Sequence, residues 1–230
     1  MKFQLMLAPM EGITDAAFRT LAYQNGADLT FTEMARVANL ARNKKGEVAR
    51  ISILDSTPTQ IQLAGSKLAE YEKFLSVFKP SEGFHGFNLN LGCPSPEFIR
   101  QGIGAAMIKR VTRVQEVIKI IDKHGYECSV KLRLGLNQYE KERGAYLNLI
   151  KNVDASFFIV HARTAAQTDR DPVDTSAYES CVATGKKIVA NGGIKTKEQV
   201  TEMKGKGMYG AMIGKAAIGN PGIFRELDIE

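Results

Sequence analysis

The sequence has few cysteines, and their spacing excludes two kinds of protein. Cys93, Cys128 and Cys181 are odd in number and far apart, and no pair has the CxxC spacing. This pattern excludes a disulfide framework and offers no cysteine-based zinc site. We therefore expect no bound metal and a reducing compartment, the cytoplasm.

The sequence also lacks a long apolar run. No stretch reaches the length of about 18 apolar residues that a membrane-spanning helix needs. The N-terminal segment 1–9 contains a short apolar run, but Gln4, Pro9 and Glu11 interrupt it too early for a signal peptide. We therefore expect a soluble protein without a membrane partner, whose first residues form a buried strand.

What the chain does contain is enough apolar residues for one large core. Of its 230 residues, 44% are hydrophobic, and the formal net charge is +6. Length and composition fit a single domain spanning residues 1–230. The positive balance is compatible with an anionic partner without identifying it, and nothing in the composition indicates an oligomeric state.

Short β-branched runs alternate with longer amphipathic segments, which is typical of βα units around a parallel sheet. Eight such units predict an α/β protein with a (β/α)8 TIM barrel. A doubly wound open sheet is the alternative, but the glycine-rich turn that normally follows its first strand is absent. The predicted strands span 4–8, 29–32, 59–64, 86–91, 129–134, 157–161, 188–191 and 211–214, and the predicted helices include 14–23, 33–42, 67–78, 111–124 and 140–152.

The ends of the predicted strands carry many polar residues. In such barrels the active site lies at the carboxyl ends of the strands. Polar groups buried there each need a partner, so we expect these side chains to converge on a ligand. The residues at these ends are Pro9, Met10, Glu33, Gln62, Asn90, Cys93, Lys131, Arg133, His161, Arg163, Asn191, Gly192, Gly193, Gly214 and Lys215.

Two features of these strand ends predict an anionic ligand. The glycines at 192–193 and Gly214 leave backbone amides accessible beside Lys215, as in phosphate-binding barrel loops, although the same glycines can simply make tight turns. Lys131 and Arg133 lie two residues apart on one strand and so point to the same face. Lys131 alone leaves two roles open, a Schiff base or charge compensation of a reduced flavin.

Cys93 and His161 are the candidate chemical groups. Cys93 lies in the segment 90–94, Asn-Leu-Gly-Cys-Pro, where glycine permits a bend after the strand and proline blocks an immediate helix. A thiol is mostly protonated at neutral pH and can act as a general acid, and no base adjacent in sequence supports a nucleophilic role. His161 fits either a core histidine or the barrel mouth, and the nearby Arg163 favours the mouth.

Taken together and in order, these motifs resemble the tRNA-dihydrouridine synthase family. The resemblance implies an FMN-binding barrel that reduces selected uridines of tRNA to 5,6-dihydrouridine, with NADPH or NADH as the electron donor. It covers nearly the whole chain. The similar segments are 7–12 (Leu-Ala-Pro-Met-Glu-Gly), 90–94, 131–135 (Lys-Leu-Arg-Leu-Gly), 161–164 (His-Ala-Arg-Thr), 191–194 (Asn-Gly-Gly-Ile) and 213–221.

The resemblance also implies roles for individual residues. Cys93 would be the catalytic acid, which protonates C5 of uracil while reduced FMN delivers hydride to C6. Asn90, Arg133 and Arg163 would bind the substrate. The cofactor-binding set would be Pro9, Met10, Gln62, Lys131, His161, Asn191, Gly193, Gly214 and Lys215.

A tRNA substrate adds two expectations. The target base has to leave the folded RNA and enter the barrel mouth above the flavin. Loop arginines such as Arg36, Arg163 and Arg170 would contact phosphates, so that affinity falls as salt rises.

Departures from the family keep alternatives open. Lys215 stands where the family normally has arginine, and segment 165–172 lacks the usual aromatic and glycine positions. We also expect no C-terminal helical tRNA-binding domain within residues 1–230. The alternatives are an FMN-dependent dehydrogenase of a free pyrimidine, of the dihydroorotate or dihydropyrimidine type, and a non-catalytic flavin- or RNA-binding barrel.

Overall fold

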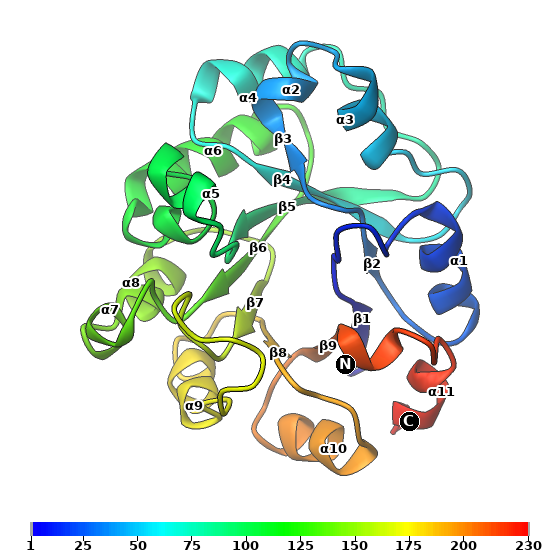
Figure 1. The fold of residues 1–230 in the computed structure, drawn as a ribbon, viewed down its shortest axis with the longest axis vertical. Coiled ribbons are helices and arrows are strands. Elements are labelled where there is room, and N and C mark those ends of the chain that lie inside the picture. The colour runs from blue at the N-terminus through cyan, green and yellow to red at the C-terminus, as the bar shows by residue number, and fades with distance from the viewer. Residues whose placement is uncertain (1, 230) are drawn as a thin grey trace.

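Parallel strands surround a common centre, and helices lie outside them (Figure 1). The computed structural model describes residues 2–229. Around the wall the strands follow the order β1-β9-β8-β7-β6-β5-β4-β2, with β3 paired to the end of β4. The predicted (β/α)8 TIM barrel is confirmed. The strands are β1 Gln4–Leu7, β2 Thr30–Phe31, β3 Ala35–Arg36, β4 Thr59–Ala64, β5 Phe84–Leu91, β6 Cys128–Arg133, β7 Phe158–His161, β8 Ile188–Asn191 and β9 Gly210–Ile213.

The barrel closes between β1 and β2 through a short seam. Met6 pairs with Leu29 in an isolated parallel bridge. The Leu7 N–H donates to the Leu29 carbonyl at 2.9 Å, and the Asp28 N–H donates to the Leu5 carbonyl at 2.7 Å. Because β2 itself spans only Thr30–Phe31, this seam is much shorter than the β4–β5 ladder.

The helices bury one apolar face each against the outside of the barrel. In α6 the buried residues Val114, Val117, Ile118 and Ile121 recur at helical spacing. The helices are α1 Ala16–Gln24, α2 Val37–Leu40, α3 Lys45–Arg50, α4 Leu68–Leu75, α5 Pro96–Gln101, η1 Gly104–Lys109, α6 Val111–Lys123, α7 Gln138–Glu142, α8 Ala145–Asn152, α9 Ser176–Val182, α10 Lys197–Gly205, η2 Lys215–Ala217 and α11 Ile223–Leu227.

Two predicted helices differ from the structure. The segment predicted as a helix over 33–42 begins instead with β3, because β4 extends beyond the short β2 and its free edge pairs with Ala35 and Arg36. Only Val37–Leu40 then forms α2. The predicted helix over 140–152 is divided into α7 and α8 by Gly144, whose φ of 67° is left-handed.

The interior of the barrel has two unlike walls. Inward-facing residues alternate with outward-facing ones along each strand, so they can be read from the register. What we call the apolar wall comes from β1, β2, β7, β8 and β9, and the polar wall comes from β4, β5 and β6. The apolar wall includes Met6, Phe31, Ile159, Val189 and Met212, and the polar wall includes Gln60, Gln62, Asn88, Asn90, Ser129 and Lys131.

Candidate active site

The strand register brings the predicted site residues into two successive layers at the carboxyl ends. Asn90 pairs with Lys131 across β5 and β6, and Arg133 pairs with His161 across β6 and β7. His161 in turn pairs with Asn191 across β7 and β8. Neighbouring strands therefore contribute a row of polar groups to the barrel mouth, which steps up by two residues along β6, from Lys131 to Arg133.

Cys93 is held in a turn directly after β5. The Asn90 side-chain oxygen accepts the N–H groups of Gly92 at 3.1 Å and Cys93 at 2.9 Å. The Cys93 carbonyl accepts the Ala105 N–H at 3.0 Å. Gly104 has a φ of 59°, and a Cβ there would lie 2.9 Å from the Cys93 carbonyl oxygen, so glycine is required for this close approach. The turn therefore has little freedom.

Cys93 lines a cavity of about 360 Å³ whose other lining residues are mostly charged. The Arg36 guanidinium donates to Glu97 at 2.9 Å and lies 4.7 Å from the centre of the Phe98 ring. The hydrogen bond to Glu97 raises the pKa of Arg36. The sequence indicated Arg36 but not its partners, because they follow a different strand. The lining residues are Glu11, Met34, Arg36, Glu47, Arg50, Cys93, Ser95, Glu97 and Phe98.

The thiol of Cys93 is accessible, in contrast to the other two. Cys93 is partly exposed, whereas Cys128 and Cys181 are buried. Burial raises the pKa of Cys181 to about 12, so that thiol stays protonated. Only Cys93 is therefore placed to meet a substrate.

Lys131 and Arg133 make the mouth of the barrel cationic. The Arg133 guanidinium donates to the carbonyls of Thr164 at 2.7 Å and Gln167 at 3.1 Å. Within residues 2–229, the Lys131 ammonium makes no hydrogen bond or ion pair. Burial, together with the charge of Arg133, lowers the pKa of Lys131 to about 8. An anionic group in the mouth would give this ammonium the partner that it lacks.

His161 is a neutral imidazole in this setting. Burial lowers its pKa to about 2, and the positive charges of Lys131, Arg133 and Arg163 act in the same direction. A guanidinium can only donate, and Arg163 Nη1 lies 3.1 Å from His161 Nε2. The ring therefore accepts at Nε2 and carries its proton on Nδ1.

Arg163 is buried, contrary to the exposed loop position expected of a phosphate contact. Its side chain donates to the carbonyls of Asp171 at 2.8 Å and Asp169 at 3.2 Å, in addition to His161. These contacts shape the loop between β7 and α9. Arg170, on the same loop, is exposed.

The glycines after β8 pack closely against the row of polar residues. A Cβ at Gly192, whose φ is 121°, would lie 2.8 Å from the His161 ring. Gly193 has a φ of 70° and is exposed. Asn191 donates to the Met212 carbonyl at 2.9 Å, which joins the ends of β8 and β9. Backbone amides at this corner can therefore be approached without interference from side chains.

The ends of β9 and β1 complete the mouth. A Cβ at Gly214 would lie 3.8 Å from the Met10 sulfur, so Met10 and Gly214 are neighbours. Pro9, which precedes Met10, is partly exposed. Lys215 is exposed and forms an ion pair with Asp169, which reaches over from the loop after β7. Gln62, on the opposite side, is 1% exposed and donates to Asn88 at 2.7 Å.

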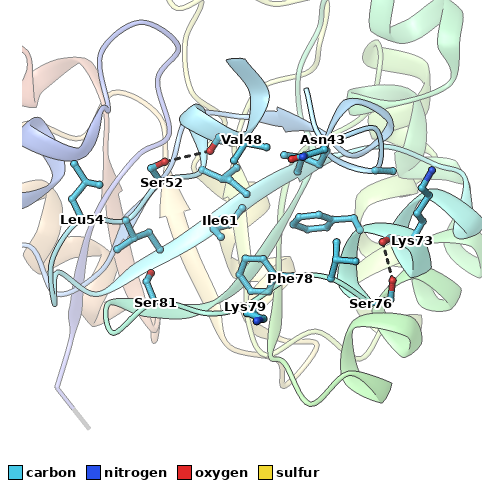
Figure 2. Close-up of a pocket in the computed structure, with 16 residues that line it drawn as sticks. Asn43, Val48, Ser52, Leu54, Ile61, Lys73, Ser76, Phe78, Lys79 and Ser81 are labelled. Carbon is cyan, nitrogen blue, oxygen red and sulfur yellow. Dashed lines mark hydrogen bonds between the residues drawn. The ribbon is translucent and has the colours of Figure 1, made fainter. Parts of the chain in front are cut away.

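A larger cavity lies on the outer side of the barrel wall (Figure 2). Its volume is about 920 Å³, and it is lined by residues of α2, α3, α4 and the outward-facing Ile61. Its lining is mainly apolar and contains no Cys, His, Asp or Glu. Its polar side chains are Asn43, serines and lysines outside the barrel wall, away from the carboxyl ends of the strands, so the candidate active site is the mouth beside Cys93.

Residues 2–229 contain neither a cluster of metal ligands nor a membrane-spanning helix. Within that range no three His, Cys, Asp or Glu side chains are grouped so that they could hold a metal ion. No helix among these residues has the length and apolar character required to cross a membrane.

Structural comparison shows the same fold in proteins of distant sequence. N-(5'-phosphoribosyl)anthranilate isomerase from Pyrococcus furiosus matches with a TM-score of 0.57 and 14% identity over 99% of this chain and 96% of its own. Nitroalkane oxidase from Streptomyces ansochromogenes matches with a TM-score of 0.56 and 16% identity, over 92% and 65% of the two chains. These similarities support the barrel alone.

Sequence comparison identifies the family. tRNA-dihydrouridine synthase B of Pseudomonas putida is 29% identical, over 97% of this chain and 67% of its own length. A probable tRNA-dihydrouridine synthase of Helicobacter pylori (strain J99) is 31% identical, over 97% and 69%. The family profile described as "Dihydrouridine synthase (Dus)" matches residues 6–229, and the chain therefore belongs to the dihydrouridine synthase family.

Proposed function

We propose that the protein is an oxidoreductase that reduces selected uridines of tRNA to 5,6-dihydrouridine, with FMN as its cofactor. Membership of the dihydrouridine synthase family supports the reaction, and its relatives are named for tRNA. The observation that carries the proposal is the position of Cys93. Its accessible thiol lines a cavity at the mouth of a barrel whose Lys131 has no anionic partner within residues 2–229.

The chemistry of the mouth fits a flavin with a phosphate tail. Lys131 would supply positive charge for the electron-rich end of the ring system, and Arg133 adds charge beside it. Asn191, Gly193, Gly214 and Lys215 would hold the phosphate, the bare amides of the glycines acting with the Lys215 charge. Pro9 and Met10 would lie along the ring, and Gln62 and His161 would bind its polar atoms. Bound FMN, after its reduction by NADPH or NADH, would supply hydride to C6 of uracil.

Cys93 supplies the proton. When C6 of the uracil receives hydride, negative charge develops at C5, and a protonated thiol quenches it by donating its hydrogen there. The turn held by Asn90 and Gly104 keeps that thiol at the cavity. A thiol oriented in this way needs no adjacent base, and none is bonded to Cys93 Sγ within residues 2–229.

Substrate recognition would involve Asn90 and Arg133. The Asn90 oxygen is already occupied by the Cys93 turn, so its remaining amide hydrogen is the group available to the uracil. Arg36, beside the Cys93 cavity, and the exposed Arg170 would contact RNA phosphates. For Arg163 we propose a positioning role instead, because its donors are engaged by the loop and by His161.

The domain assignment follows from the same proposal. We assign residues 1–230 to one FMN-binding catalytic barrel, and within residues 2–229 η2 and α11 follow β9. Basic residues on the barrel would take part in gripping tRNA, and we propose no role for a metal. The chain's formal charge of +6 and its unpaired thiols suit an enzyme that meets RNA in the cytoplasm.

The test begins with a visible spectrum of the purified protein and identification of FMN released on denaturation. Unmodified tRNA is then incubated with NADPH or NADH, and dihydrouridine is measured by mass spectrometry of the nucleosides. Cys93→Ala should lower product formation by roughly 10²–10⁴-fold while FMN stays bound. Cys181→Ala, which removes a buried thiol on α9, is the matched control and should retain activity.

Two results would contradict the proposal. A colourless protein that FMN cannot reconstitute would remove the cofactor. Turnover of orotate, dihydroorotate or a free dihydropyrimidine, with no change in tRNA, would instead favour an FMN-dependent dehydrogenase of a free pyrimidine. Borohydride trapping of Lys131 with a carbonyl substrate would indicate Schiff-base chemistry.

A further inference from the structure

A continuous column of hydrogen-bonded side chains runs through the polar wall of the barrel. We call it the amide column, and it has five members. All but Asn90 are at most 2% exposed. In order from the base of the barrel to its mouth, the members are Gln60, Ser129, Asn88, Gln62 and Asn90.

The hydrogen bonds of the amide column are short, and in each of them the donor is the residue nearer the mouth. Asn90 donates to Gln62 at 2.9 Å, and Gln62 donates to Asn88 at 2.7 Å. Asn88 donates to the Ser129 hydroxyl at 2.7 Å, which donates to Gln60 at 2.5 Å. Each donor points toward the base, so the column has one polarity.

The base of the column determines this polarity. Gln60 Nε2 donates to the His85 carbonyl at 3.2 Å, and a carbonyl can only accept. The Gln60 oxygen must therefore face Ser129, whose hydroxyl gives its one hydrogen to it. Ser129 is then left to accept from Asn88, and each amide above is oriented in turn.

The mouth end requires the same polarity independently. The Asn90 oxygen accepts the backbone N–H groups of Gly92 and Cys93, which can only donate. The Asn90 amide nitrogen must therefore face Gln62. The backbone groups at the two ends of the column therefore require the same direction of hydrogen bonding through all five side chains. A chain satisfied in this way stabilises a single set of rotamers.

We infer that Ser129 is a positioning residue for the Cys93 turn, acting through the amide column. This inference rests on the proposed function for its catalytic meaning. Ser129 is the one hydroxyl of the column, and a single oxygen there both accepts and donates. It lies two contacts below Gln62 and holds the amides of Asn88 and Gln62 in the direction that leaves the Asn90 oxygen free for Cys93.

The polarity also determines which groups the mouth offers to a ligand. Gln62 uses its oxygen for Asn90 and one amide hydrogen for Asn88, so its second amide hydrogen remains. Asn90 likewise retains one amide hydrogen. Gln62 is 1% exposed, whereas Asn90 is partly exposed and can add a donor, so the ligand atom that meets Asn90 is an acceptor, such as a carbonyl oxygen of a pyrimidine or a flavin.

The experiment measures the reactivity of Cys93 in protein that contains neither FMN nor tRNA. Iodoacetamide modifies the accessible Cys93, and peptide mass spectrometry reports its rate separately from the buried Cys128 and Cys181. Ser129→Ala should change the rate at which iodoacetamide modifies Cys93, called the Cys93 rate below, by about fivefold to tenfold. This factor is the equivalent of one lost hydrogen bond. With tRNA, kcat should fall by about the same factor and KM by less.

Matched variants separate positioning from general destabilisation. Val189→Ala removes a side chain of the apolar wall that is 0% exposed, and it should lower the melting temperature without changing the Cys93 rate by more than about twofold. Ser129→Thr keeps the hydroxyl and should restore the wild-type rate. If Ser129→Ala does not fold, Gln60→Met cuts the column one contact lower and should change the Cys93 rate in the same way.

The outcomes are distinguishable. Equal Cys93 rates in wild type, Ser129→Ala and Gln60→Met would overturn the positioning role, and so would a rate change that Val189→Ala reproduces. Wild-type protein that forms no dihydrouridine would contradict the proposed function, while the Cys93 rates would still decide whether the amide column controls the turn.

Discussion

The two walls fill the interior of the barrel with opposite kinds of side chain. The apolar wall fills its half with side chains such as Met6, Ile159 and Met212, which are at most 1% exposed and need no partners. The polar wall buries amides and a hydroxyl, which are costly unless every group is bonded. Its amides are bonded, and Lys131 alone lacks a partner within residues 2–229. The polar wall therefore stabilises the fold less than the apolar wall does, but its polar groups and the Lys131 charge are available to bind a ligand.

The largest expected effect comes from breaking the polar wall where the apolar wall offers a matched change. Asn88→Leu leaves Gln62 Nε2 without its acceptor and the Ser129 oxygen without its donor, at about 1–3 kcal/mol each, while the bond from Ser129 to Gln60 remains. Ile159→Val should lower the free energy of unfolding by only about 0.5–1.5 kcal/mol. Denaturant titration measures both, and equal losses would show that the walls do not differ.

Lys131→Met removes the positive charge of the polar wall and so makes it more like the apolar wall. FMN affinity should fall by about 10–100-fold, because a charge-assisted contact is lost. The unliganded protein should gain on the order of 1–3 kcal/mol of stability, because a partly buried cation with no partner within residues 2–229 is removed.

The pH dependence of FMN binding supplies the control for that variant. With a pKa of about 8, Lys131 loses its charge as pH rises through that value, and wild-type affinity should decline from pH 7 to 9. Fluorescence titration should show no such decline in Lys131→Met. A decline that persists in the variant would assign the effect to another group.

His161 gives a smaller effect, at the boundary between the walls. Its pKa of about 2 lies below the unfolded value of about 6.5, so between these limits the unfolded chain binds a proton that the folded chain does not. Stability should therefore fall as pH drops below 6.5, with a slope of about 1.4 kcal/mol per pH unit from this residue. Unfolding from pH 6.5 to 5 should show the slope, and His161→Gln should flatten it.

The smallest expected effect concerns the exposed ion pair between Asp169 and Lys215. Asp169→Asn frees the lysine for a phosphate, and FMN affinity should rise by about two- to fivefold at low salt. The gain should disappear at high salt because exposed charges are screened. Asp122→Asn on α6 is the control. An unchanged affinity in Asp169→Asn would mean that Lys215 does not meet the phosphate.

The strands and their polar ends could be predicted because their signals are local. β4 and β8 occupy the predicted ranges, and the period of two placed Lys131 and Arg133 on one face. β3 could not be predicted, because its pairing depends on the free edge of β4, a neighbour from another part of the chain.

The partners within the site were beyond a sequence-based prediction. The burial of Arg163 arises from a loop that folds back on it. The amide column needs three strands in register before Gln60, Asn88 and Ser129 can meet, and no spacing along the chain encodes amide orientation. Phe98, under Arg36, likewise comes from a separate helix.

The short seam between β1 and β2 makes the barrel mechanically asymmetric. Opening fluctuations require few bonds to break there, so the Leu7 and Asp28 amide hydrogens should exchange with deuterium earlier than those of β5 or β6. Pro9 and Met10 follow β1 and border the mouth beside this seam. Transient opening of the seam would widen the mouth on the side of β1, while the amide column in the polar wall keeps Cys93 in place.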